Sequence, residues 1–282
     1  MSGARLAPLI DIGINLGHDS YDADRAEVVA RAQAAGVVQF VITGASLEGS
    51  RKALELARAA PGVAFATAGC HPHHAIDHPS EAERLEALAY EPEVVAVGEC
   101  GLDYHRNFSS PAEQRTAFAR QLETAVRIGK PLFLHERDAH ADMVAMLTEH
   151  ATGLPRAVVH CFTGDAEALD RYLAMGLWIG ITGWVCDERR GVNLRELVAR
   201  IPPGRLMIET DGPYLLPRDL APKPVSRRNE PMYLAHIARV IAALRAETAA
   251  QLAAHTSVAA REFFALPTIK DCAAPDSVAA SP

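Results

Sequence analysis

The segment "VVAVGECGLDYHR", residues 94–106, runs from apolar residues directly into Glu99, with Asp103 and His105 close behind. A carboxylate that follows a buried stretch of chain is costly unless it is paired, hydrogen-bonded or bound to a cation. The residue types around Glu99 therefore predict either an ion pair or a metal site. Which of the two applies depends on whether other apolar runs end in the same kind of residue.

Acids and imidazoles follow several other apolar runs. Imidazole and carboxylate groups are the usual ligands of divalent cations in hydrolytic sites. One histidine or aspartate after a strand is most often an ordinary capping or hydrogen-bonded residue, but the repetition at separate strand ends favours a metal site. We assign His71 to this site and place His73, His74, His78 and His140 outside it. The residues that follow apolar runs are Asp11, Asn15, His71, Glu99, His135, His160 and Asp211.

Eight short apolar runs position these residues. They are rich in Val, Ile, Leu and Phe and lack strict apolar/polar alternation, as is typical of strands that are buried on both faces. They predict strands at 6–11, 37–43, 63–69, 94–99, 131–136, 157–162, 177–182 and 206–211. Alanine-rich amphipathic segments predict helices at 22–35, 47–60, 81–90, 112–129, 139–150, 165–175, 192–200 and 231–246. Ser80 and Ser110 are the expected caps of the third and fourth helices.

Eight strand–helix units in sequence are what a (β/α)8 TIM barrel requires. A doubly wound open sheet is the alternative, but it often has a glycine-rich phosphate turn after the first strand, whereas "DIGINLG" contains no GxGxxG. We therefore predict an α/β fold, a TIM barrel in one domain over residues 1–266, with an extra C-terminal helix at 248–264 and a mobile tail at 267–282. In such a barrel the C-terminal strand ends form the active site.

The composition restricts the class of protein. With 282 residues, of which 49% are hydrophobic, the chain can bury a large core, and a net charge of −7 argues against a general nucleic-acid coat. The five cysteines form no CxxC pair and suit reduced thiols in a cytoplasmic protein. No window is long and apolar enough to span a bilayer. We expect a cytoplasmic monomer with no membrane contact and no obligate protein partner.

Long segments of the chain resemble the TatD family of metal-dependent deoxyribonucleases, which are amidohydrolase-like barrels. They are "AGCHPH" (68–73), "VGECGLDY" (97–104), "LHERDAH" (134–140), "VVHCFTG" (158–164), "GITGWVCDERRG" (180–191) and "ETDGPYLLPRDL" (209–220). The resemblance implies a 3′→5′ exonuclease of single-stranded DNA, with RNA as a further substrate, acting in DNA repair or degradation. It also implies a divalent metal cofactor, Mg²⁺ first and Mn²⁺ or Zn²⁺ as alternatives.

The resemblance also implies roles for individual residues. By position, the metal ligands of the family fall on Glu99, His135 and His160, and the catalytic residues on Asp211 and His71.

One departure from the family concerns the first strand. Many members carry "DxHxH" there, whereas this chain has "DIGIN", with Gly13 and Asn15 at the two histidine positions. Glycine offers no side-chain ligand, and a neutral amide offers only a weak one. We therefore expect one strongly occupied metal position, and a second ion bound only weakly by Asp11, Asn15 and Asp211.

Basic residues cluster in the loops after the seventh and eighth strands. Arginine binds phosphate through two parallel hydrogen bonds, which hold a strand without base preference. The alternative is a solvated loop with internal ion pairs to Asp219 and Glu230. The predicted phosphate contacts are Arg189, Arg190, Arg218, Lys223, Arg227 and Arg228. Tyr104, Phe108, Trp184 and Tyr214 are candidates for base stacking, with buried packing as the equal alternative.

The sequence leaves three other functions open. A small-molecule ester or amide hydrolase of this fold usually keeps the HxH pair and often a lysine that bridges two metals, which "LFLHER" lacks. A D-aminoacyl-tRNA deacylase would use the same barrel. A non-catalytic metal-binding accessory protein would have no need of the residues Glu99, His135, His160 and Asp211.

Overall fold

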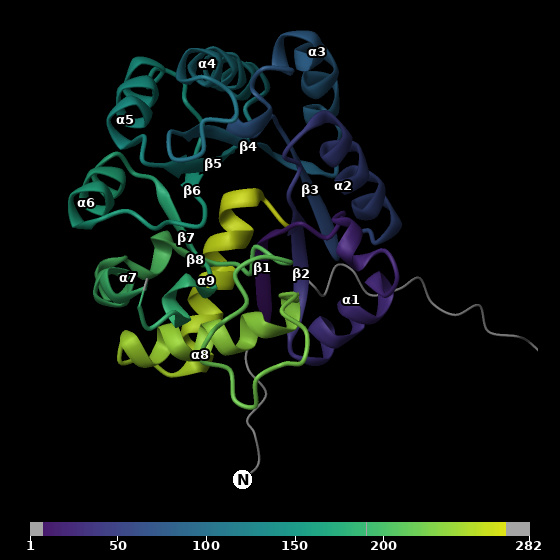
Figure 1. The fold of residues 1–282 in the computed structure, drawn as a ribbon, viewed down its shortest axis with the longest axis vertical. Coiled ribbons are helices and arrows are strands. Elements are labelled where there is room, and N and C mark those ends of the chain that lie inside the picture. The colour runs from purple at the N-terminus through teal and green to yellow at the C-terminus, as the bar shows by residue number, and fades with distance from the viewer. Residues whose placement is uncertain (1–7, 190, 269–282) are drawn as a thin grey trace, which may run out of the picture.

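Eight parallel strands form one sheet in the computed structural model, which describes residues 8–189 and 191–268. Their order in the sheet is their order in the chain, and each neighbouring pair is parallel. Figure 1 shows the strands around the centre and most of the helices outside them. The strands are β1 (Leu9–Ile14), β2 (Val37–Ile42), β3 (Ala64–Ala68), β4 (Val94–Asp103), β5 (Leu132–Arg137), β6 (Ala157–Val159), β7 (Trp178–Ile181) and β8 (Leu206–Ile208). This is the predicted (β/α)8 barrel.

Helices alternate with the strands along the chain. The α-helices of the described residues are α1 (Arg25–Ala34), α2 (Leu47–Ala59), α3 (His78–Ala89), α4 (Pro111–Ile128), α5 (His140–Glu149), α6 (Ala166–Ala174), α7 (Val192–Leu197), α8 (Leu234–Leu244) and α9 (Ala249–Phe264). Short 3-10 helices are η1 (Asp19–Tyr21), η2 (Pro72–His74), η3 (Gly183–Cys186), η4 (Val198–Arg200), η5 (Pro203–Arg205) and η6 (Pro231–Tyr233). The predicted helices are therefore present, with small differences at their ends.

Several strand boundaries differ from the prediction. β6 and β8 end at Val159 and Ile208, three residues before the predicted ends, whereas β1 and β4 extend three and four residues beyond theirs. β1 ends at Ile14 rather than at residue 11, so Asp11 lies within the strand and is fully buried. β4 extends to Asp103, which places Glu99 in mid-strand. Both β1 and β4 contain a register irregularity, in β1 after Asp11 and in β4 after Gly98. Such a bulge changes which side chains face the interior, and apolar periodicity alone does not reveal it.

One of the two predicted helix caps is correct. Ser110 caps α4 in a reciprocal capping box with Glu113. Ser80 does not cap α3, because that helix begins at His78 and Ser80 Oγ donates to the carbonyl oxygen of Asp77 at 2.9 Å. Pro79 in the first turn allows this earlier start, since a proline there removes no helical hydrogen bond.

Helix α9 closes the N-terminal end of the barrel. The fully buried ring of Phe263 lies 5.2 Å from that of Trp178 at the start of β7, measured between centroids. Ser257 Oγ donates to the carbonyl oxygen of Pro8, just before β1, at 2.6 Å. The interior residues that pack with α9 are Ile10, Ile12, Val41, Phe65, Ala96, Phe133, Val158 and Met207. Only the opposite end, where the strands terminate, is left for a site.

The first and last strands are joined by contacts beyond the end of β8. Asp211 N donates to Gly13 O at 2.8 Å, and Asn15 N donates to Gly212 O at 2.9 Å. The buried carboxylate of Asp11 accepts from Thr210 N at 3.0 Å and from Thr210 Oγ1 at 2.5 Å. These bonds complete the circle of strands and hold the segment after β8 against β1.

Helices of the described residues are all too short or too polar to cross a membrane. The predicted tail at 267–282 lies outside the described residues except for its first two positions.

Replacing Phe263 with Ala should lower the free energy of unfolding by about 3–5 kcal/mol, because it opens a cavity at the floor of the barrel. Val258→Ala on the same helix is the control, since Val258 is 50% exposed and its truncation should change stability by less than about 0.5 kcal/mol. Urea unfolding of both variants measures the difference. Equal stabilities would contradict the assigned role of α9.

Candidate metal centre

Glu99 lies among three histidines that come from other parts of the barrel. Its Oε1 is 2.8 Å from His160 Nε2, 3.0 Å from His135 Nδ1 and 3.4 Å from His71 Nε2. These side chains are largely buried, and the most open of them, His135, is 20% exposed. The structure therefore brings together the residues assigned to the site from the sequence, and their role as ligands stays a prediction.

The backbone of β4 allows this approach. Gly98 has φ +138°, a conformation that side chains rarely adopt, and a Cβ there would lie 2.2 Å from the carbonyl oxygen of Phe133. Glu99 N donates to the carbonyl oxygen of Gly44, just beyond β2, at 2.9 Å. The glycine in "VGEC" is thus required by the close packing of β4 on β5.

Carboxylates on the outer side of two imidazoles determine which nitrogen faces Glu99. His160 Nδ1 lies 3.3 Å from Glu209 Oε2, and His135 Nε2 lies 3.3 Å from Asp103 Oδ2. A histidine that donates from one nitrogen to a carboxylate presents the lone pair of the other nitrogen to a metal. His160 could therefore bind an ion through Nε2 and His135 through Nδ1, which are the two nitrogens nearest Glu99.

His71 is oriented differently. Its Nδ1 accepts a hydrogen bond from His73 N at 3.0 Å, so the hydrogen of the neutral ring lies on Nε2. Burial lowers the pKa of His71 well below its ordinary value, which keeps the ring neutral. The ligand atoms of His71, Glu99 and His135 lie within 4.8 Å of one another. Because Nε2 carries the hydrogen, however, His71 is better suited to donate to an anion than to bind a metal.

The charges at the centre match a divalent cation. Although burial opposes its charge, Glu99 and Glu209 raise the pKa of His160 well above its ordinary value. The pKa of His135 is also raised, against burial, by Asp103 and Glu99. Two imidazolium groups carry the same positive charge as one divalent ion. Such an ion would therefore satisfy these carboxylates while leaving both rings neutral, as metal binding requires.

Glu209 is a site residue that the sequence reasoning missed. It is fully buried, its Oε1 accepts from Cys161 N at 2.5 Å, and its Oε2 faces His160. A Cβ at Gly13 would lie 2.2 Å from Glu209 Oε2, so Glu209 occupies the space into which a side chain at position 13 would project. A side chain at position 13 would therefore require the Glu209 carboxylate to move. The signal was present in "LMIETD", where Glu209 lies inside the predicted strand 206–211, two residues before Asp211.

Asp103 and His73 were also not assigned to the site. Asp103 Oδ2 lies 2.9 Å from His73 Nε2, in addition to its contact with His135. Although burial opposes ionisation, hydrogen bonds from His135 and His73 lower the pKa of Asp103 strongly. His73 therefore belongs to the second layer of the centre, contrary to the expectation that it lies outside the site.

Asp211 and Asn15 meet at the mouth of the barrel. Asn15 Nδ2 donates to Asp211 Oδ1 at 3.0 Å, which orients the carboxylate. Burial raises the pKa of Asp211 to about 7, with His160 acting against the shift and Glu99 adding to it. An acid with a pKa near neutrality can exchange a proton with a water molecule in either direction.

Asp11 does not join Asn15 and Asp211 as expected. Both of its oxygens accept from Thr210, and Oδ1 also accepts from Gly13 N at 3.3 Å. Asp11 was placed at the site because the strand was expected to end there, whereas β1 continues to Ile14. Its position is a correction to the predicted set for a second ion, in which Asn15 and Asp211 alone lie together.

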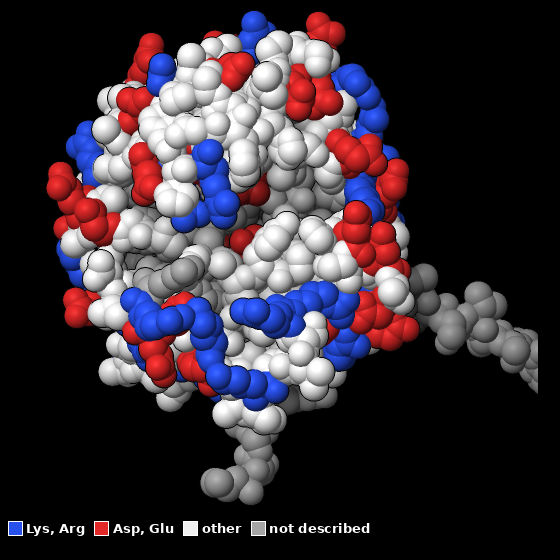
Figure 2. Space-filling view, in the orientation of Figure 1, with Lys and Arg blue, Asp and Glu red and all other residues white. Residues whose placement is uncertain are grey.

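Basic side chains border the mouth. Figure 2 shows Lys and Arg side chains along one edge of a central hollow in which acidic atoms are visible. A cleft of about 410 Å³ is lined by Trp184, Arg218, Lys223 and Arg227 among others. Arg189 is exposed and lies two positions after Asp187, which also lines this cleft. Arg190 lies outside the described residues.

Arg228 differs from the other predicted phosphate contacts. Its guanidinium donates to both oxygens of Asp24 at 2.7 Å and to Glu230 Oε1 at 2.8 Å. Hydrogen bonds from Arg228 and Arg31 lower the pKa of Asp24 to about 2. The internal ion pair that the sequence offered as an alternative for this loop is therefore what holds Arg228.

The four aromatic candidates differ in exposure. Phe108 is 67% exposed, and its ring lies 4.7 Å from that of His73 between centroids. Tyr214 is 53% exposed and lies 5.7 Å from the ring of His18. Tyr104 is committed to a hydrogen bond with Asp142 at 2.6 Å, and Trp184 is half-buried. Phe108 and Tyr214 are thus the two that remain open for stacking.

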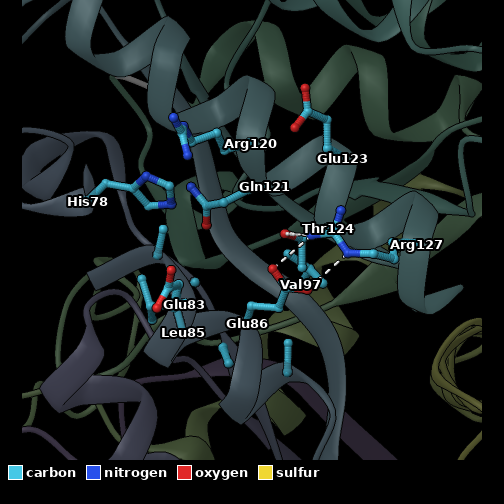
Figure 3. Close-up of a pocket in the computed structure, with 14 residues that line it drawn as sticks. His78, Glu83, Leu85, Glu86, Val97, Arg120, Gln121, Glu123, Thr124 and Arg127 are labelled. Carbon is cyan, nitrogen blue, oxygen red and sulfur yellow. Dashed lines mark hydrogen bonds and ion pairs between the residues drawn. The ribbon is translucent and has the colours of Figure 1, made fainter. Parts of the chain in front are cut away.

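A second cavity, of about 120 Å³, lies between α3 and α4. Figure 3 shows His78, Arg120 and Gln121 close together on one side of it, and the pair between Arg127 and Glu86 on the other. Its lining includes none of the residues assigned to the site. Ala68 and Val97 in that lining belong to the core outside the barrel, so this cavity is separate from the metal centre.

The chain is similar to known proteins along nearly its whole length. The family model "TatD related DNase" matches residues 10–265. The "3′-5′ ssDNA/RNA exonuclease TatD" of Erwinia billingiae is 53% identical over 260 residues, 92% of this chain and 100% of that protein. A solved "hydrolase TatD family protein" from Entamoeba histolytica has a TM-score of 0.84 at 26% identity, over 93% of this chain and 99% of that one. YJJV, a TatD homolog from Escherichia coli K12, has a TM-score of 0.83 at 28% identity, over 92% and 98%.

The buried acid Asp11 should give the protein a pH-dependent stability. Burial raises the pKa of Asp11 from 3.8 to about 8. Between these values the native state holds a proton that the unfolded chain has lost, so the free energy of unfolding falls as pH rises. In Asp11→Asn this decline should be shallower, by up to about 1.4 kcal/mol per pH unit between pH 5 and 7, while the raised pKa of Asp211 keeps part of it.

Denaturant unfolding at several pH values measures this difference. Asp170→Asn is the matched control, because Asp170 is 59% exposed and should leave the pH profile of the wild type unchanged. Parallel profiles for the wild type and Asp11→Asn would show that Asp11 is ionised in the folded protein.

Proposed function

The chain belongs to the TatD-related DNase family, and we propose that it is a metal-dependent exonuclease that removes nucleotides from the 3′ end of single-stranded DNA and RNA. The observation that carries the proposal is the meeting of Glu99, His135 and His160 beside Asp211, in a chain that is 53% identical to a curated exonuclease of that kind. The mouth faces solvent and is bordered by basic side chains, as an anionic strand requires.

The donor set suits a divalent ion held by Glu99, His135 and His160. Mg²⁺ is the proposed ion, and Mn²⁺ or Zn²⁺ are alternatives that accept the same groups. When bound, the ion would neutralise phosphoryl oxygens and lower the pKa of a water ligand. Glu209 and Asp103 hold the two imidazoles with the correct nitrogen inward.

In this proposal Asp211 accepts the proton of the attacking water, and His71 forms a hydrogen bond to the phosphate. Asp211 is the general base for this step. Asn15 keeps its carboxylate in one orientation. His71 donates from Nε2 to a phosphate oxygen, because its Nδ1 is already an acceptor for His73 N.

A second ion is proposed to bind weakly, if substrate is present to complete its ligands. Asn15 and Asp211 offer an amide and a carboxylate oxygen, but Asp11 is engaged with Thr210. The space of a first-strand histidine at Gly13 is taken by Glu209. One strongly occupied metal position is therefore the expected state.

Wider properties complete the proposal. We take residues 1–266 as one domain that acts as a cytoplasmic monomer, without a membrane or an obligate protein partner. A role in DNA repair or degradation would follow from the 3′-end activity. A small-molecule hydrolase, a D-aminoacyl-tRNA deacylase and an accessory protein are the alternatives that the following assay separates.

The function is tested with 5′-labelled single-stranded DNA, single-stranded RNA and duplex DNA, with Mg²⁺ or with EDTA. We expect a ladder that shortens from the 3′ end of the single strands and stops with EDTA. Asp211→Asn should lower the rate by roughly 10²–10⁴-fold, because the proton acceptor is lost, while its metal content stays near that of the wild type. Asp170→Asn is the exposed control and should keep full activity.

Other outcomes identify the alternatives. Intact oligonucleotides beside a hydrolysed ester or amide would favour the small-molecule hydrolase, and release of D-amino acids from tRNA would favour the deacylase. Metal binding without turnover of any of these substrates would leave the accessory protein. Full activity in Asp211→Asn would remove Asp211 from the mechanism.

The exposed residues Lys223 and Arg227 should contribute to strand binding through phosphate alone. In the inactive Asp211→Asn background, the double variant Lys223→Ala/Arg227→Ala should bind single-stranded DNA more weakly and with a shallower salt dependence. Each lost phosphate contact lowers the slope of log K against log salt by about 0.7. Fluorescence anisotropy over a salt series measures it.

The control for this prediction is Arg51→Ala/Arg84→Ala, which removes two exposed charges from α2 and α3. It changes net charge equally but should leave the slope unchanged. Equal slopes in the two double variants would show that the loop contributes only general charge.

A further inference from the structure

We propose that Cys186, Asp219 and His236 form a second metal site, outside the catalytic mouth, for a thiophilic divalent cation such as Zn²⁺. The three residues come from η3, from the loop after β8 and from α8. One ligand atom from each, a sulfur, a carboxylate oxygen and a ring nitrogen, lies within 4.8 Å of the other two. Separate segments of chain thus deliver three different donor atoms to one point.

The chemistry of the donors selects the type of ion. Thiolate, imidazole and carboxylate together suit zinc in tetrahedral geometry, whereas Mg²⁺ and Ca²⁺ take oxygen ligands. His236 Nε2 and Asp219 Oδ1 are 2.7 Å apart, so a small shift would admit an ion between them. The fourth ligand would be water, because the side chains of Asp219 and His236 are 23% and 26% exposed.

The charges of the site also balance. Cys186 is fully buried, and burial together with Asp219 raises the pKa of its thiol well above the ordinary value. Ion binding would release this thiol proton to solvent, and His236 would bind through Nε2 with its hydrogen on Nδ1. A thiolate and a carboxylate then offset the two charges of the ion, so no net charge is buried.

The place of the cluster in the fold suggests what the ion would do. Asp187 follows Cys186 in the chain and Arg218 precedes Asp219, and both Asp187 and Arg218 line the basic cleft. Arg218 Nη1 and Asp187 Oδ2 are 3.4 Å apart, so the two loops already touch. An ion bound by Cys186, Asp219 and His236 would connect both loops to α8 and so restrict the movement of the cleft walls.

Cobalt provides a direct test, since a Co²⁺–thiolate bond gives a charge-transfer absorption that oxygen and nitrogen ligands do not. The full chain, stripped of metal and kept reduced without added thiols, is titrated with Co²⁺. We expect this band in the wild type and its loss in Cys186→Ser. Cys161→Ser is the matched control, because Cys161 adjoins His160 at the catalytic mouth and should leave the band unchanged.

Two further variants keep the test decisive. If Cys186→Ser does not fold, as judged by circular dichroism, the partly exposed His236→Gln should weaken Co²⁺ binding at the band by roughly tenfold or more. Glu99→Gln/His135→Gln should retain the band and one equivalent of Zn²⁺, which separates this site from the catalytic one. Absence of the band in the wild type, its survival in Cys186→Ser, or unchanged affinity in His236→Gln would overturn the proposal.

Discussion

The carboxylate of Glu99 is buried at the point where the barrel strands converge, and it is surrounded by three imidazoles. Its pKa is held well below the ordinary value by His71, His160 and His135, against the effect of burial. Two more buried carboxylates, Asp103 and Glu209, stand behind these rings. Buried carboxylates this close together destabilise the fold unless positive charge lies between them. A divalent cation, as proposed, would supply that charge at one point, and the orientation of His135 and His160 would suit it.

This requirement also explains the unusual first strand. Glu209, just after β8, contacts His160, just after β6, and its carboxylate occupies the space over Gly13. A histidine at position 13 would displace the Glu209 carboxylate from the place where it contacts His160. The chain therefore has no side chain at position 13 and instead a carboxylate that contacts His160, just after β6. The remaining partner on that side, Asn15, is used to orient Asp211.

Much of the fold and of the inner site could be predicted because both depend on repetition. Eight buried runs with helices between them favour a barrel over an open sheet, and the C-terminal ends of parallel strands in a barrel lie at one end. The errors arose where the backbone departs from regular pairing. β1 has a register irregularity after Asp11 and continues to Ile14. Asp11, which was expected at the end of the strand, is therefore buried and hydrogen-bonded to Thr210.

The supporting layer was less accessible from the sequence, since it depends on side-chain direction. Neither Asp103 nor Glu209 is distinguishable by spacing from an acid that merely ends a strand. Arg228 is likewise indistinguishable from Arg227 until its bonds to Asp24 are seen. Pairings between residues about 200 positions apart, such as Asp24 with Arg228, have no local signature.

The position of α9 has a consequence for how the protein is made. The helix that seals the barrel comes last among the described elements, yet it packs on Ile10 and Ile12 of the first strand. The contacts that join β1 to the segment after β8 are equally distant along the chain. A nascent polypeptide emerging from the ribosome would thus carry an unsealed, apolar barrel until α9 had been synthesised. Such long-range closure favours slow folding and gives molecular chaperones a period in which to act.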